Sequence, residues 1–265
     1  MVTSIRGQAI SIIPDIEAGE ITSAASLLFA PGARPPAAAI ERLANENGGF
    51  SVSLDPAQSG AASDRGDWLE LLVNGLTFDL IGLAPGPAAA PPPRTHNFGL
   101  DDGPGFSGAE AVTLKPGPHL ASGAKMLPVV RSMAWLAAQL ADLPGARAVA
   151  WHPAHSWSAP GHFRGSVLRW TEGGVFPGLG LAAFAAMPDG GLQSQGLALF
   201  TGQELRLEPG LADDRAAVAK IGLRLLHWLV EHGRLKGPES IAGPEGQPLR
   251  LEPSGNGRFV RVWAS

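Results

Sequence analysis

Apolar residues recur along this chain at two spacings, one typical of helices and one typical of strands. Where they return every three or four positions, an amphipathic helix with one buried face is expected. Where they alternate with polar residues or form a short run, a strand is expected. The pattern predicts helices over residues 37–47, 125–143, 159–171 and 213–232, and strands over residues 24–30, 50–54, 68–73, 76–83, 111–114, 146–151, 179–187 and 196–200, with 205–207 extending the last of these and two short strands closing the chain.

Turn-forming residues mark the ends of several of these elements. Asn74-Gly75 lies between two apolar runs, which is a strong short-range signal of a β-hairpin. Gly233 follows the last long helix and is a residue type that ends helices. Asp213-Asp214 places negative charge at the start of that helix, where the helix dipole favours it.

The order of the predicted elements indicates an α+β fold with mixed or antiparallel sheets and helices packed on one face. We expect one compact unit with a first α+β lobe over residues 23–87 and a second over residues 109–265. Residues 88–108, rich in proline and glycine, are expected to form a crossing loop between them. Residues 1–22 are expected to form an N-terminal arm or an edge strand. Both lobes begin with a strand, a Pro-Gly turn, a helix and a strand, so a pseudo-repeat of two β-α-β-β-like lobes is a further hypothesis.

Composition and charge argue against several classes of function. The chain has no cysteine, which excludes disulfides, iron–sulfur clusters, thiolate zinc sites and cysteine nucleophiles. A net charge of −4 gives no electrostatic reason to expect nucleic acid or an anionic membrane as a partner. No apolar run is long enough to span a membrane and no secretory signal is recognisable, so a soluble cytoplasmic protein is expected. Abundant alanine, glycine and proline with no tyrosine suggest a GC-rich bacterial genome.

The closing segment carries a family resemblance. LHWLVEHGRLKGPESIAG reads as a helix, a glycine stop and a turn before a strand, and QPLRLEPSGNGRFVRV reads as two strands with Ser254 in a turn. With the Asn-Gly hairpin and the strand that ends near Pro85-Gly86-Pro87, this order resembles the bacterial domain-of-unknown-function 4261 family from Ser26 onward. Residues 88–125 depart from the family pattern. The resemblance implies an α+β fold, and because that family has no agreed activity, cofactor or catalytic residue, it implies no chemistry.

The densest set of chemically versatile side chains is WHPAHSWSAPGH, residues 151–162, which follows a predicted buried strand. Strand ends and the loops beyond them are common places for sites. We therefore take Trp151, His152, His155, Trp157 and His162 as the candidate ligand-binding residues, with the two tryptophans as pocket walls. The three histidines are also candidate zinc ligands, although their spacing matches no known metal motif. The alternative is a Trp/His-rich loop that packs over the sheet edge, and no cofactor is predicted on that interpretation.

Other candidate signals point to structure more than to chemistry. Ser156 and Ser158 lie near His155, but no Gly-x-Ser-x-Gly elbow accompanies them, so a catalytic serine is not predicted. The segment FGLDDGPGF lacks the ligand spacing of a calcium loop and the lysine of a phosphate loop, which favours a solvated turn. His227 lies at the edge of the apolar stripe of the last helix and is expected to be structural.

These observations favour a non-catalytic binding or protein-interaction domain, with an unknown protein or a second copy of the chain as partner. Neither nucleic acid nor a membrane is expected as a partner. The alternative is a metal-dependent or hydrolytic enzyme that uses residues 151–162. A third interpretation is partner binding through the Pro-rich segment 84–108, whose deletion would then leave the melting temperature nearly unchanged.

Overall fold

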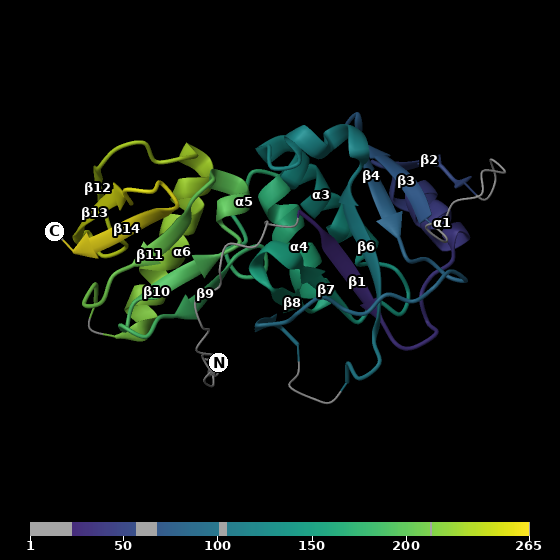
Figure 1. Cartoon of the computed structure of the whole chain (residues 1–265), viewed down its shortest axis with the longest axis horizontal. Helices are drawn as coiled ribbons and strands as arrows, with labels where there is room; N and C mark the ends of the chain where they lie inside the picture. Colours follow the sequence, from purple (N-terminus) through teal and green to yellow (C-terminus); the bar gives the residue numbers. More distant parts are fainter. Residues whose placement is uncertain (1–22, 57–67, 101–104, 213, 265) are drawn as a thin grey trace.

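The computed structural model describes residues 23–56, 68–100, 105–212 and 214–264, and the predicted N-terminal arm over residues 1–22 lies outside this part of the chain. The described residues form an α+β fold built on two mixed sheets that lie side by side along the long axis of the molecule (Figure 1). The α+β class predicted from the sequence is confirmed.

The first sheet has eight strands and is mostly antiparallel. Its only parallel pair among the described strands joins the last two in the order. The order is β2 (Ser51–Leu54), β3 (Trp68–Val73), β4 (Leu76–Ile81), β6 (Glu110–Pro116), β1 (Ala25–Phe29), β7 (Ala148–Trp151), β8 (Ser156–Ser158) and β5 (His96–Phe98). The predicted hairpin joins β3 and β4, and both Asn74 and Gly75 adopt the positive φ angles that such a tight turn requires.

One face of this sheet is covered by helices, and these helices create the main core. The helices are α1 (Ala37–Asn47), α3 (Leu127–Leu140) and α4 (Pro160–Thr171), with a 3-10 turn η1 (Pro118–Gly123) leading into α3. α3 packs on β1, β4 and β6, α1 packs on β2, and α4 packs on β7. Every second strand residue, such as Leu27, Val112 and Val149, is fully buried under them.

The opposite face of the first sheet carries a smaller apolar cluster and a row of polar side chains. Leu28, Ala111 and Ala148 belong to this second cluster, and Phe106 packs against it from the Pro/Gly-rich segment. Because strand side chains alternate between faces, the residues next to the buried core positions necessarily point to this side. The polar row described below lies here.

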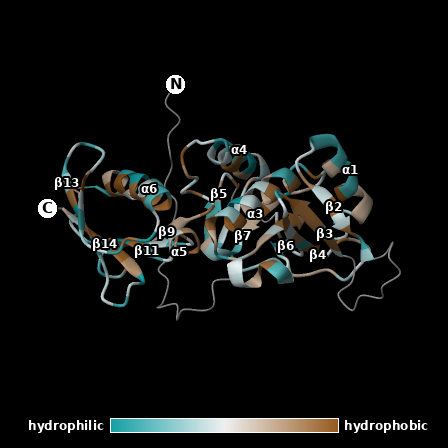
Figure 2. Ribbon diagram, turned by 90° about the horizontal axis from the view of Figure 1, so that it is seen from above, coloured by the Kyte–Doolittle hydropathy of each residue, from teal (hydrophilic) through white to brown (hydrophobic). Residues whose placement is uncertain are grey.

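The second sheet has six strands and one long helix. The order is β12 (Glu239–Ala242), β13 (Pro248–Pro253), β14 (Phe259–Ala264), β11 (Glu204–Leu207), β10 (Leu192–Gln195) and β9 (Ala183–Ala186). Helix α6 (Arg215–His232) begins at the predicted Asp214 cap, which accepts a hydrogen bond from the backbone N–H of Ala217, and ends before Gly233. It packs on β11, and its buried side lies against the sheet (Figure 2).

The two sheets divide the chain differently from the two lobes expected from the sequence. β1 to β4 lie before residues 88–108 and β6 to β8 lie after them, yet all belong to one sheet in which β1 sits between β6 and β7. The second sheet begins only at β9, after α4. A pseudo-repeat of the two expected lobes stays a hypothesis.

The Pro/Gly-rich segment is part of the first sheet. It supplies β5, and Ala89 bridges to Ala111. Arg34 holds the chain that leads into it, because the guanidinium donates to the carbonyls of Gly82 and Gly86 and pairs with Glu110 at 2.7 Å. These contacts favour a structural role for the segment over that of a detachable partner-binding arm.

Three local predictions were wrong. Residues 196–200 were expected to form a strand, but Ala198–Thr201 forms the short helix α5, whose first backbone N–H groups bind the Glu204 carboxylate. Alternation of apolar and polar residues over 50–54 predicts that Phe50, Val52 and Leu54 point inward. However, β2 has a register shift between Val52 and Leu54, and Leu54 is 40% exposed. Three strands, not two, close the chain, because β12 pairs with β13.

None of the helices in the described part of the chain combines the length and apolar character needed to cross a membrane.

Candidate ligand-binding site

Polar side chains gather across the central strands of the first sheet, on the face opposite helices α1, α3 and α4. Thr113 and Lys115 lie two residues apart on β6 and so share a face. Strand pairing places Ser26 of β1 opposite Thr113, and Asp79 of β4 opposite Lys115. His152, the first residue after β7, joins the same face, because its backbone N–H donates to the carbonyl of Ala24. Three strands and a loop therefore bring the group together.

A hydrogen-bond chain connects three of these side chains. Ser26 Oγ lies 2.9 Å from Thr113 Oγ1 and 2.8 Å from His152 Nε2. Ser26 is fully buried, whereas Thr113 and His152 are each partly exposed. The serine therefore holds the imidazole and the threonine hydroxyl in fixed positions at the surface of the site.

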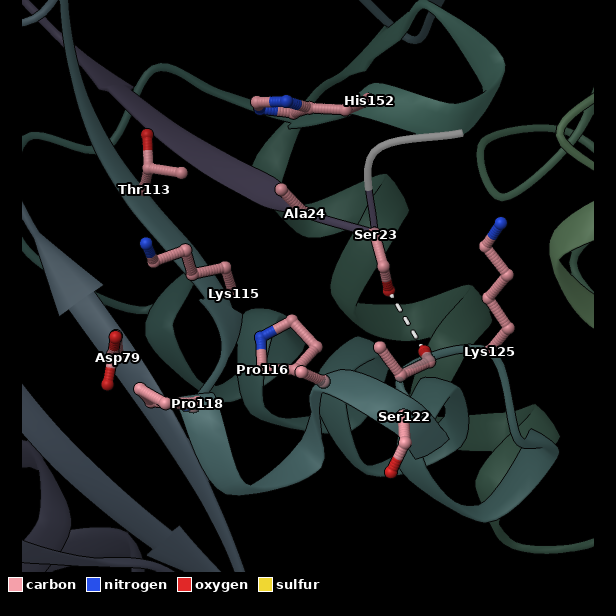
Figure 3. Close-up of a pocket in the computed structure, with 13 residues that line it drawn as sticks. Ser23, Ala24, Asp79, Thr113, Lys115, Pro116, Pro118, Ser122, Lys125 and His152 are labelled. Atoms are coloured by element: carbon pink, nitrogen blue, oxygen red, sulfur yellow. Dashed lines mark hydrogen bonds between the residues drawn. The ribbon is translucent and has the colours of Figure 1, made fainter. Parts of the chain in front are cut away.

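A cavity of about 710 Å³ opens over this polar face, between the ends of β4 and β6 and the turn η1 (Figure 3). Its volume is within the range of small-molecule pockets. Ser23 closes one side and is held there by its hydrogen bond to the carbonyl of Ala124, at 3.2 Å. The lining residues are Ser23, Ala24, Asp79, Thr113, Lys115, Pro116, Gly117, Pro118, Ala121, Ser122, Ala124, Lys125 and His152.

The charges of the cavity are two ammonium groups and one carboxylate. Lys115 is partly buried, Lys125 is exposed, and Asp79 is almost fully buried. In Figure 3, Lys115 lies beside Asp79 on one side of the cavity, and Lys125 lies on the other side. Among the described residues, neither lysine makes an ion pair or a hydrogen bond, whereas Asp79 does have an interaction partner. The cavity therefore favours an anion over a cation.

His152 is held in its neutral form at neutral pH. Burial, and to a smaller extent the neighbouring His155, lowers the pKa of its imidazole to about 4. A neutral imidazole donates one hydrogen bond and accepts another. His152 therefore presents a polar group to a ligand without adding positive charge.

The five residues that the sequence marked as ligand-binding do not all meet at this cavity. His152 lines it. Trp151 is fully buried in the main core, stacked on Phe200 at 6.3 Å between ring centroids, and does not line the cavity. Trp157 lies in the smaller apolar cluster. His155 ends the 3-10 turn η2 (His152–Ala154) with a positive φ of 47°, and His162 is exposed on α4.

The geometry supports neither a metal site nor a serine nucleophile among the described residues of 151–162. Within the part of the chain that the structure describes, no group of three or more His, Asp or Glu side chains is placed to hold a metal ion. Ser156 is fully buried and donates to the carbonyl of Gly180 at 2.5 Å. Ser158 is also buried. Neither serine has the exposure that a nucleophile needs.

Sequence reasoning missed Ser26, Thr113, Lys115 and Lys125. A weak signal was present in VTLKP, residues 112–116, where a threonine and a lysine alternate with buried apolar residues. A lysine inside such a strand points to one face with the threonine. Nothing in the sequence showed that β1, β4 and β6 are neighbours, so the convergence on Ser26 and Asp79 could not be inferred.

Comparison with known proteins does not assign the site. No protein-family model matches the chain, and searches of curated proteins and of solved structures give no significant match. Membership of the domain-of-unknown-function 4261 family accordingly stays a prediction.

Proposed function

We propose that this protein is a non-catalytic binding protein whose cavity takes a small anionic molecule bearing a carboxylate or phosphate group. The observation that carries the proposal is Lys115, a partly buried lysine that lines the cavity and has no acidic partner among the described residues. The Lys115 ammonium group makes no direct ion pair with any described carboxylate, so its charge is available to a ligand and an anionic ligand would stabilise it. Lys125 supplies a second positive charge at the rim.

The polar neighbours of Lys115 suit such a ligand. Thr113 and Ser122 offer hydroxyl groups, and neutral His152 offers a ring nitrogen. These groups hydrogen-bond carboxylate or phosphate oxygens. Asp79, opposite Lys115 in the sheet, would repel part of an anion and so favours ligands whose charge lies toward Lys125.

Binding is favoured over catalysis by the state of the Ser26–His152 pair, in which only His152 lines the cavity. Ser26 contacts His152 but is fully buried and does not line the cavity. Among the described contacts, no carboxylate orients the His152 ring. A serine nucleophile needs both access to substrate and an oriented base.

The test is calorimetric titration of the purified protein with inorganic phosphate and with citrate, compared between wild type, Lys115→Met and Lys220→Met. Lys115→Met keeps the length of the side chain and removes its charge. A charged hydrogen bond contributes about 1.5–3 kcal/mol, so affinity should fall at least about tenfold. Lys220 is exposed on α6, and its substitution should leave affinity unchanged.

Equal affinity in the three proteins, or no binding of either probe by wild type, would contradict the proposal. Raising the salt concentration should weaken binding in wild type more than in Lys115→Met, because salt screens the attraction that the variant lacks. Far-ultraviolet circular dichroism of both variants controls for misfolding.

We propose that the chain is a bacterial cytoplasmic member of the domain-of-unknown-function 4261 family. The support is its closing helix–turn–strand segment, its alanine-rich and glycine-rich composition and its lack of cysteine.

A further inference from the structure

Two arginines are stacked on aromatic rings at the outer surface of the first sheet. The Arg94 guanidinium lies 4.9 Å from the centroid of the Trp157 ring, and the Arg147 guanidinium lies 5.1 Å from that of Phe106. The two rings contact each other edge to face, with centroids 5.2 Å apart. We call these four side chains the Arg–aromatic cluster.

The cluster is assembled by the fold from three separate parts of the chain. Arg94 and Phe106 come from the Pro/Gly-rich segment, Arg147 directly precedes β7, and Trp157 belongs to β8. Trp157 is only 7% exposed and packs on the small apolar cluster of the sheet. The rings are therefore a rigid base, and each holds a guanidinium by a cation–π contact.

The two guanidinium groups have no acidic partner among the described residues, in contrast to several other arginines of this protein. Arg34, Arg206 and Arg261 each pair with a carboxylate. Arg94 and Arg147 are both exposed, and within the described part of the chain neither makes an ion pair or a hydrogen bond. Stacking on a ring face leaves the N–H edge of a guanidinium available to carboxylates.

We infer that the Arg–aromatic cluster is a docking site for a short acidic peptide segment of a partner protein. Each guanidinium presents a fork of N–H donors whose geometry matches one carboxylate, and two forks held on one rigid base match two acidic side chains. Stacked nucleobases fit less well, because Arg94 covers the Trp157 ring and the ring is almost fully buried.

This site is separate from the cavity and takes a different ligand. None of its four residues lines the cavity. It places the protein-interaction role on Arg94 and Phe106 of the Pro-rich segment together with Arg147 and Trp157, on the first sheet and not on a detachable arm. The inference does not depend on the proposed anion site.

The experiment measures the fluorescence anisotropy of a labelled oligoglutamate peptide added to the full chain at low salt. We compare wild type with Arg94→Gln, Arg147→Gln, the double variant and Arg215→Gln, which removes an exposed arginine on α6. Each single change in the cluster should weaken binding at least fivefold, the double change should abolish it, and Arg215→Gln should leave it unchanged. Arg94→Lys should also weaken binding, because lysine keeps the charge but loses the planar fork.

The inference is overturned if wild type does not bind the peptide, if Arg215→Gln weakens binding as much as the cluster variants do, or if Arg94→Lys binds like wild type. A single-stranded oligothymidylate that binds more tightly than the peptide, and loses binding in the same variants, would also overturn it in favour of nucleic acid. Lys115→Met, which alters the cavity, should bind the peptide as wild type does. The proposal for the cavity and the inference for the Arg–aromatic cluster can therefore fail independently of each other.

Discussion

At the scale of single residues, the most consequential feature is the neutral imidazole of His152. Its ring contacts Ser26 at 2.8 Å and lies beside His155, and burial lowers its pKa to about 4. The unfolded chain has an ordinary histidine pKa near 6.5. The folded state therefore binds a proton at His152 less readily than the unfolded state does. This contribution to stability is fully present above pH 6.5 and is lost as the pH falls toward 4.

Replacing His152 by glutamine should therefore flatten the pH dependence of stability. Between pH 7 and pH 5, the free energy of unfolding of wild type should fall by about 2 kcal/mol more than that of His152→Gln. Urea unfolding at the two pH values measures this difference. His162→Gln, on the exposed side of α4, is the matched control and should follow wild type. An equal fall in the free energy of unfolding between pH 7 and pH 5 in wild type and in His152→Gln would contradict this prediction.

Glu204 acts in the opposite direction over part of this range. Burial raises the pKa of its carboxyl to about 7, although hydrogen bonds from Ser194 and from the backbone N–H groups of residues 196–198 lower it. Its contribution is therefore fully present below about pH 4.5 and is lost as the pH rises through 7. Because Glu204 is present in both wild type and His152→Gln, its effect cancels in their comparison.

At the scale of elements, the turn between β10 and α5 positions the second sheet against the first. Gly196 adopts a φ of +90° there, and a side chain added to it would meet the backbone of the turn η2. A Cβ would lie 2.9 Å from Ala154 Cβ and 3.0 Å from the carbonyl oxygen of Leu181. A close approach of this kind leaves no space for any other residue.

Gly196→Ala should lower the free energy of unfolding by about 3 kcal/mol, the sum of an unfavourable φ and an overpacked contact. Gly210→Ala separates the two causes, since Gly210 has a similar φ of +79° but open space around its Cα. Gly210→Ala should lower the free energy of unfolding by only about 1 kcal/mol. Chemical denaturation of both variants measures the difference. Equal losses of unfolding free energy in the two variants would show that close contact with Ala154 and Leu181 adds nothing to the cost of the Gly196 substitution.

At the scale of the whole molecule, an aromatic junction joins the two sheets. Phe200 of α5 stacks on Trp151 of β7 and makes edge contacts with Trp170 of α4 and with Phe176. His96 of β5 adds a polar link, 2.7 Å from Gln195 of β10. Because the junction is apolar and closely packed, we expect the two sheets to unfold together.

Phe200→Ala should lower the free energy of unfolding by about 3–5 kcal/mol, the usual cost of removing a buried phenylalanine. Phe259→Ala, a partly exposed position on β14 outside the junction, should cost less. Tryptophan fluorescence and far-ultraviolet circular dichroism should report one coincident transition in wild type. Two separate transitions in wild type would show instead that the sheets are independent units.

Local pattern predicted most of the elements but not their partners. The 3.6-residue spacing located α1, α3, α4 and α6, and Asn74-Gly75 located the β3–β4 hairpin, because these signals depend on residues close in sequence. Residues 196–200 misled the same reasoning. Their apolar run suits a strand, but three backbone N–H groups there bind the Glu204 carboxylate, a contact that the hydrophobic pattern does not show.

By itself, the sequence determined the α+β class, the helices α1, α3, α4 and α6, the hairpin and the absence of cysteine chemistry, since these follow from local spacing and composition. Only the tertiary structure decided that β1 lies between β6 and β7, that Thr113, Lys115 and His152 line one cavity with Ser26 hydrogen-bonded to two of them, and that Arg94 and Arg147 share one aromatic base. Strand pairing sets these neighbours, and it joins residues as far apart in sequence as Ser26 and His152. A short-range pattern carries no record of which distant strand lies beside another.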